Sequence, residues 1–260
     1  MLTKLLLCAS LALTGVLAAA QGCEAVRGST FTVGVEKLQY LPLHTVDGNN
    51  HFGGFARDVL DAFAADHGYT FDYIPLPINR LYARFLTERT LDFKYPDNPQ
   101  WREELRGGAQ LSYSSVVVST EEGAMVLPHK LGKPLSSLKT LGTVLGFTPW
   151  PYKAAIDSRA LKVSTSNTTD GLLRLAMMGN LDAAYVNVDV AGYMLAGALK
   201  APGALVFDPG LPHARSDFRL ATWRCKEVVE QFNRFLQREQ GRLQQLRASY
   251  RIGEAGGNGR

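Results

Sequence analysis

The sequence predicts an α/β fold made of two similar blocks in series, each an open, mostly parallel sheet flanked by helices. Two observations support this prediction. Short apolar, β-branched runs alternate with helical stretches, and that order of elements occurs twice before a final helical section. Strands that alternate with helices favour parallel sheets, because each helix carries the chain back to the start of the next strand.

The first block follows the mature N-terminus. Residues 31–35 alternate in polarity and predict the first strand. Asp58 is expected to cap a helix that stops at Gly68. The remaining elements expected here are a loop over 40–53, a strand over 70–74, a helix over 78–86 and a strand that starts at Leu91.

The second block repeats this order. Thr148 and Pro149 are expected to open a helix, and Asp170 to cap another that stops at Gly179. Strands are expected over 141–146, 161–163 and 182–186, and a last strand over 218–223 precedes helices around 228–236 and 243–250. The last strand lacks a helix partner in the second block, so we expect it to return the chain to the first.

The N-terminus has the pattern of a secretory signal peptide. Lys4 precedes an apolar stretch over 5–17 that ends in the small residues 18–20. The stretch is shorter than the about 20 residues of a membrane span. We expect cleavage after Ala20. Lipidation of Cys23 is the weaker alternative, because the residues before it lack the usual leucine and small-residue pattern.

Cleavage would remove Cys8 and leave Cys23 and Cys225 as the cysteines of the mature chain. Two cysteines in an oxidising compartment can form a disulfide, and two unrelated thiols are the alternative.

The composition excludes several classes of function. The chain is 46% hydrophobic and 20% charged, as in ordinary globular proteins, and its net charge of +4 falls to +3 without Lys4. This charge is too small to indicate a nucleic-acid partner. No Cys/His cluster or phosphate-binding loop is present, so we expect neither a metal nor a cofactor.

Three motifs resemble those of a known family, the bacterial extracellular solute-binding proteins of family 3. Residues 54–60 (GFARDVL) look like its Gly-Phe-x-x-Asp-Leu helix entry. Residues 141–148 (LGTVLGFT) are similar to the strand-to-helix turn that begins its second lobe. Residues 178–184 (MGNLDAA) look like its Gly-x-x-Asp-Ala segment, and the three motifs occur in the family's order.

The resemblance implies a two-lobed type II periplasmic binding protein, a Venus flytrap. After a signal peptide over 1–20, residues 21–118 and 216–260 would form lobe 1, and 119–215 lobe 2. Two crossing strands would be the hinge about which the lobes close on a small polar solute. The implied protein is a periplasmic monomer that serves an ABC-type permease or signals to a membrane receptor.

The expected ligand-binding residues centre on the segment 92–101, which follows a strand. Lys94 or Tyr95 would bind an anionic or hydroxyl group, and Asp97 or Asn98 would receive a donor. A rigid turn is the alternative, since two prolines lie in the segment. Trp101 completes its set of aromatic residues.

The resemblance implies further site residues. An arginine that clamps a carboxylate would be Arg102 or Arg106, and the spacing leaves both open. The resemblance also implies an aromatic lid at Tyr40, for which core packing is the alternative, an anion site at Thr148, and Asn187 or Asp189 where amino-acid binders hold an ammonium group. Arg80 is expected from its place at a helix start, where its charge would point into the cleft, and a surface residue is the alternative. Phe147 and Asn187 depart from the family pattern, so the solute need not be an ordinary amino acid.

Catalysis is an alternative that the sequence does not favour. A dehydratase-like enzyme on this fold would need an acid–base pair in the cleft. The five histidines show no triad or metal spacing, and Lys94 with Asp97 is the pair that such chemistry would use. This pair would serve binding equally well.

Overall fold

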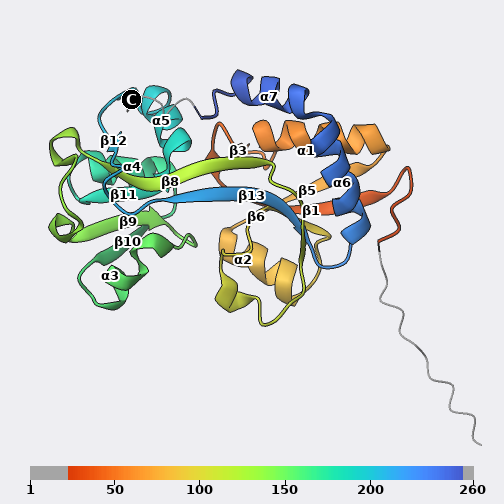
Figure 1. The fold of residues 1–260 in the computed structure, drawn as a ribbon, viewed down its shortest axis with the longest axis horizontal. Helices are drawn as coiled ribbons and strands as arrows, with labels where there is room; N and C mark the ends of the chain where they lie inside the picture. The colour runs from red at the N-terminus through yellow and green to blue at the C-terminus, as the bar shows by residue number, and fades with distance from the viewer. Residues whose placement is uncertain (1–22, 254–260) are drawn as a thin grey trace, which may run out of the picture.

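The computed structural model describes residues 23–253, which form two lobes joined by a pair of long strands (Figure 1). The predicted signal peptide and its cleavage site lie outside the described residues. Within residues 23–253, no helix is both long and apolar enough to cross a membrane.

Lobe 1 is built around a central parallel strand. β1 (Thr30–Glu36) pairs in parallel with β5 (Thr70–Leu76) and with β6 (Phe93–Asp97). One face of this sheet is covered by α1 (Phe55–His67) and by two helices from the end of the chain, α6 (Lys226–Arg238) and α7 (Gln240–Ser249). The other face is covered by α2 (Ile78–Tyr82), which continues as a π-helix over Ala83–Thr87.

The start of α1 differs from the sequence prediction. Asp58 lies in the first turn of the helix and does not cap it; the N-cap is Gly54. Gly54 has φ +90°, and a Cβ there would lie 2.9 Å from the Cα of His44, so the close approach requires glycine. The predicted end is confirmed, because Gly68 closes α1 in the left-handed conformation.

Lobe 2 has the same layered arrangement. β9 (Thr140–Val144) pairs in parallel with β10 (Lys162–Ser166) and β11 (Ala183–Asn187). The helices are α3 (Lys153–Asp157), α4 (Thr169–Met177) and α5 (Val188–Ala196). Thr168, not Asp170, caps α4, because its Oγ accepts a hydrogen bond from the amide of Gly171 at 3.2 Å. Asn187 caps α5 in the same way, a helix that the sequence analysis did not predict.

Two long strands connect the lobes and lie side by side across the middle of the molecule (Figure 1). β8 (Val118–Val126) and β13 (Ala214–Thr222) are antiparallel, with Val118 opposite Phe218 and Glu122 opposite Ala214. They join both sheets into the order β10-β9-β11-β8-β13-β6-β1-β5. The expected lobe boundaries, 118/119 and 215/216, fall in this pair.

Short elements complete the fold. β7 (Ser112–Tyr113) pairs with β13, and β12 (Val206–Phe207) pairs with β8. The expected loop after β1 contains a small antiparallel sheet of β2 (Gln39–Tyr40), β3 (His44–Val46) and β4 (Phe52–Gly53).

Cys23 and Cys225 form a disulfide, so pairing is confirmed over the alternative of two separate thiols. Their Cα atoms are 4.8 Å apart, and 202 residues separate them in sequence. The bond ties the segment before β1 to the start of α6, next to the core of lobe 1.

Candidate binding site between the lobes

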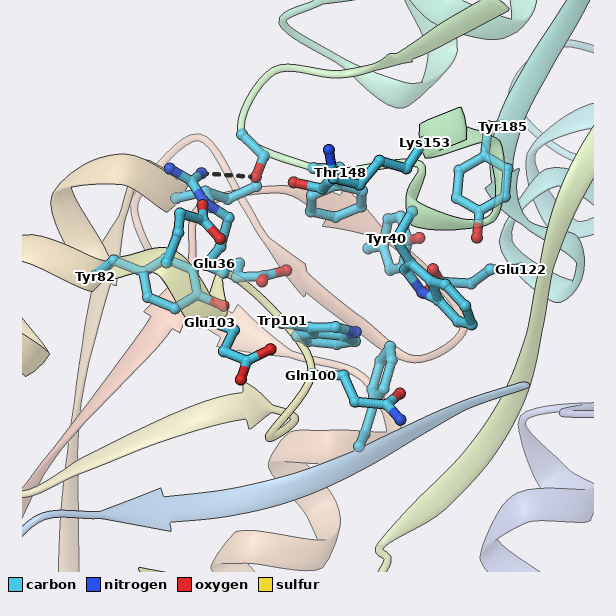
Figure 2. Close-up of a pocket in the computed structure, with 17 residues that line it drawn as sticks. Glu36, Tyr40, Tyr82, Gln100, Trp101, Glu103, Glu122, Thr148, Lys153 and Tyr185 are labelled. Carbon is cyan, nitrogen blue, oxygen red and sulfur yellow. Dashed lines mark hydrogen bonds and ion pairs between the residues drawn. The ribbon is translucent and has the colours of Figure 1, made fainter. Parts of the chain in front are cut away.

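A cavity of about 240 Å³ lies between the lobes and is lined by residues of both (Figure 2). On lobe 1 it meets Glu36, the last residue of β1. On lobe 2 it meets Gly146, Phe147 and Thr148, which follow β9. Ligands of open α/β sheets bind beyond the carboxyl ends of the strands, and this cavity lies there in both lobes.

Aromatic side chains form much of the cavity wall. The rings of Tyr40 in lobe 1 and Phe147 in lobe 2 meet edge to face across the cleft, with centroids 5.7 Å apart. Trp101 packs edge to face on Phe218 of the connecting strand β13, at 5.3 Å. The other aromatic residues of the wall are Tyr82, Trp150 and Tyr185.

Carboxylates outnumber cations in this wall. Figure 2 shows the Glu36 carboxylate between Tyr82 and Tyr40, with Glu122 beside Tyr40 on its far side. Glu36 is 3% exposed, and its Oε2 accepts no hydrogen bond among the described residues. The nearest basic atom to it is Nε2 of His44, at 3.5 Å. The four glutamates that line the cavity are Glu36, Glu103, Glu104 and Glu122.

Both cations in the cavity wall already have partners. Nζ of Lys153 lies 2.6 Å from the carboxylate of Asp157, one turn along α3. Arg102 donates from Nε to Glu104 at 2.8 Å and from Nη1 to the Asn79 side-chain oxygen at 3.1 Å. The same Nη1 donates to the carbonyl of Gly146 at 3.2 Å. Arg102 therefore bridges the two lobes at the edge of the cavity.

Four of the expected site residues line the cavity: Tyr40, Trp101, Arg102 and Thr148. Thr148 lies before a 3-10 helix over Trp150–Tyr152, and α3 begins only at Lys153, so the helix start expected directly at Thr148 is displaced. Burial raises the pKa of Tyr40 well above its ordinary value, so its hydroxyl stays protonated.

The segment 92–101 lies largely behind the cavity wall. The sequence analysis placed it after a strand, but β6 continues through Asp97, so Lys94, Tyr95 and Asp97 are strand residues with 0% exposure. Nζ of Lys94 lies 3.2 Å from Asp97 and 4.4 Å from the centre of the Tyr82 ring. Lys94 thus supports a wall residue from behind, and Tyr95 belongs to the hydrophobic core.

The two candidate arginines have different surroundings. Arg106 is held at 3.2 Å by the Asp97 carboxylate and donates to the backbone carbonyls of Asn98 and Trp101 at 2.7 and 2.8 Å. These bonds fix the turn after β6. Asn98 fixes the same turn, because its side-chain amide donates to the carbonyl of Asp217 at 2.9 Å. Arg102 is therefore the candidate that reaches the cavity.

The three remaining expected residues lie outside the cavity wall. Arg80 is 58% exposed and pairs with Glu88 at 2.8 Å. Asn187 uses its side-chain oxygen to cap α5 at 3.1 Å. Asp189 accepts a hydrogen bond from the amide of Gly253, at 3.1 Å, near the end of the described chain.

Sequence reasoning missed Glu36, Glu122 and Tyr185. Glu36 had a usable signal, because it is an acidic residue at the end of an apolar strand, where ligand groups gather. Glu122 and Tyr185 lie inside β8 and β11, and their direction toward the cavity follows only from how the lobes face each other.

Burial raises the pKa of Glu122 from its ordinary 4.5 to about 7, against the opposing hydrogen bond from Ser216. The charges of Glu36 and Glu121 make smaller contributions to the same rise. Nε2 of His213 lies 3.9 Å from the carboxylate of Glu121, the neighbour of Glu122 in β8. The hydroxyls of Tyr40 and Tyr185, which also have raised pKa values, face the same region.

Glu122→Gln should flatten the dependence of stability on pH between about 4.5 and 7. The folded state holds the Glu122 proton more tightly than the unfolded state, so this group stabilises the fold below pH 4.5 and loses that contribution as the pH rises through about 7. Glutamine removes the titration. Denaturant unfolding of both proteins at pH 5.5 and 8 measures the change. Equal pH dependence in the two proteins would contradict the raised pKa.

Comparison with known proteins supports the fold. No protein-family model and no curated protein sequence matches the chain. An ancestral arginine-binding protein bound to arginine is similar in structure, with a TM-score of 0.69 and 18% identity over 86% of this chain and 99% of that one. A periplasmic His/Glu/Gln/Arg/opine family-binding protein from Silicibacter pomeroyi in complex with lysine has a TM-score of 0.66 and 14% identity, covering 88% and 98% of the two chains.

The periplasmic VFT2 domain of BvgS from Bordetella pertussis is also similar, with a TM-score of 0.66 and 20% identity over 85% of this chain and 93% of that one. At such identities the likeness establishes the fold. The predicted two-lobed architecture of a type II periplasmic binding protein is therefore confirmed.

Proposed function

We propose that this chain is an exported solute-binding protein that captures a small polar molecule by closing its two lobes. The observation that carries the proposal is the cavity between the lobes, walled by both and bridged by the contact from Arg102 to Gly146. A molecule in that cavity would contact both lobes at once, so its binding would favour the closed arrangement.

The similar structures support this proposal. An arginine complex and a lysine complex are among them, and one is described as the substrate-binding protein of an amino acid ABC transporter. We infer a periplasmic location and delivery to an ABC-type permease. Presentation of the closed form to a membrane receptor is the alternative.

A thermal-shift screen of the mature protein tests the proposal. Amino acids, organic acids, amines and short peptides are added in turn. A solute that binds only the folded protein should increase the free energy of unfolding by about 2.7 kcal/mol at a concentration of 100 times Kd, and the melting temperature should rise accordingly. Solutes that bind are then incubated with the protein and analysed for product. If no solute in the screen stabilises the protein, the proposal is wrong. If the protein converts a bound solute into product, the function is catalysis and not binding alone.

Arg102→Met should weaken solute binding about tenfold and lower the free energy of unfolding of the unliganded protein by at most about 3 kcal/mol. The variant loses the hydrogen bond to Gly146 that favours the closed arrangement, and a hydrogen bond from a charged donor contributes about 1.5–3 kcal/mol. Calorimetric titration with a solute from the screen measures the loss. Arg80→Met removes an exposed arginine of the same lobe outside the cavity and is the matched control. An equal loss in both variants would contradict a specific role for Arg102.

A further inference from the structure

We propose that the solute is an organic cation without a carboxylate group, an amine or a guanidine. This inference rests on the proposed function and specifies its ligand class. Three features of the cavity carry it: acidic side chains on both sides of Tyr40, aromatic faces, and cations that already have acidic partners.

The first feature is the pair of acids on the two sides of Tyr40. Glu36 lines the cavity and is almost fully buried, and its Oε2 makes no hydrogen bond among the described residues. His44 compensates that charge only when it is protonated, and its two ring nitrogens make no hydrogen bond among the described residues. A buried carboxylate without a partner is costly, and an ammonium or guanidinium group supplies hydrogen bonds and charge together.

Glu122 supplies a second acid from the connecting strand β8. Its neighbour Tyr185 is 3% exposed, and the Tyr185 hydroxyl has no hydrogen-bond partner among the described residues. A cation with several N–H donors would use the oxygens of both side chains. The Tyr185 hydroxyl and Oε2 of Glu36, both without a hydrogen bond among the described residues, line the same cavity as the Glu122 carboxyl group.

The second feature is the aromatic wall. Tyr82, Trp101 and Phe147 line the cavity around Glu36 and Tyr40. Aromatic faces attract cations by about 0.5–2 kcal/mol each, most strongly where water is excluded. The protein already uses this attraction behind the wall, where Nζ of Lys94 lies over the Tyr82 ring at 4.4 Å.

The third feature excludes a carboxylate clamp. An α-amino acid needs a free guanidinium or ammonium group for its carboxylate. Arg106 is bound to Asp97 behind the wall, Arg102 is bound to Glu104 and Gly146, and Lys153 is bound to Asp157. A ligand carboxylate would lie among four glutamates and would have to compete with Glu104 for Arg102 and with Asp157 for Lys153. Loss of the carboxylate should therefore strengthen binding.

Matched ligand pairs test this inference. The mature protein is titrated with arginine and agmatine, with lysine and cadaverine, and with glutamate and succinate as anionic controls. Agmatine and cadaverine are the decarboxylated forms of arginine and lysine. We expect at least one decarboxylated amine to raise the melting temperature and to bind at least tenfold more tightly than its amino acid.

Binding of both amino acids at least as tightly as their amines, or stabilisation by the anions alone, would overturn the inference and leave the proposed solute-binding function standing. Stabilisation by none of the compounds, nor by any in the broad screen, would overturn both.

Two variants localise the site. Glu36→Gln and Glu122→Gln should each weaken binding of the preferred amine at least tenfold at pH 8, where Glu122, with its pKa of about 7, is mostly ionised and each variant removes one negative charge from the cavity. Glu88→Gln removes an exposed carboxylate outside the cavity and is the control. Unliganded melting curves check that each variant folds. Unchanged amine affinity in both folded cavity variants would overturn the assignment.

Discussion

Lys94→Met should lower the free energy of unfolding by about 3–5 kcal/mol, the usual consequence of breaking a buried ion pair from one side. Lys94 and Asp97 are both fully buried, and Nζ of Lys94 also donates to the carbonyl of Pro96 at 2.5 Å. The variant leaves these acceptors without their cation. Arg106 stays near Asp97 at 3.2 Å, so the loss should lie toward the lower end of the range.

Thermal and denaturant unfolding measure this effect, and the melting temperature should fall by about 6–20 °C. Lys226→Met is the matched control, because Lys226 is 75% exposed and pairs with Glu230 on the surface of α6. Its effect should stay within about 0.5 kcal/mol. A ligand-binding role for the segment gives the opposite result, in which Lys94→Met abolishes solute binding and leaves the unliganded melt unchanged.

Replacing both Cys23 and Cys225 with alanine should lower the free energy of unfolding by about 2–5 kcal/mol. The disulfide closes a loop of 202 residues, so its loss restores much conformational freedom to the unfolded chain. Alanine is chosen because Cys225 is fully buried, where a serine hydroxyl would need a partner.

Unfolding of the oxidised protein, the reduced protein and the double variant separates the contributions. The reduced protein and the double variant should unfold at similar denaturant concentrations, both below the oxidised protein. The disulfide would not be stabilising if the reduced protein and the double variant both unfolded at the same denaturant concentration as the oxidised protein.

The fold was largely predictable from the sequence because it depends on local patterns. Alternating runs gave the strands of both lobes, and Gly68 ended α1 where a residue free to adopt the left-handed conformation was needed. The errors also have local causes. Asp170 was predicted to cap α4, but Thr168 is the N-cap, and both residue types can accept a backbone hydrogen bond at that position.

The site was less predictable because burial and lobe packing decide it. Lys94, Asp97 and Asn98 have the chemistry of ligand-binding residues, but they satisfy one another and the backbone behind the wall. A list of polar residues after a strand does not distinguish these two uses. Glu122 and Tyr185 reach the cavity only through the way lobe 2 faces lobe 1, which no local pattern contains.

The hydrogen bond from Arg102 to Gly146 affects the fraction of molecules that are closed and the time for which a solute stays bound. The bridge joins atoms of the chain alone, so it would favour the closed arrangement whether or not a solute is bound, and a hydrogen bond of about 1.5–3 kcal/mol would shift the ratio of closed to open molecules roughly 10- to 150-fold. Closed but empty molecules would then compete with loaded ones for any partner that recognises the closed shape. The same bridge must break before a solute leaves, so it also lengthens the residence time of the solute.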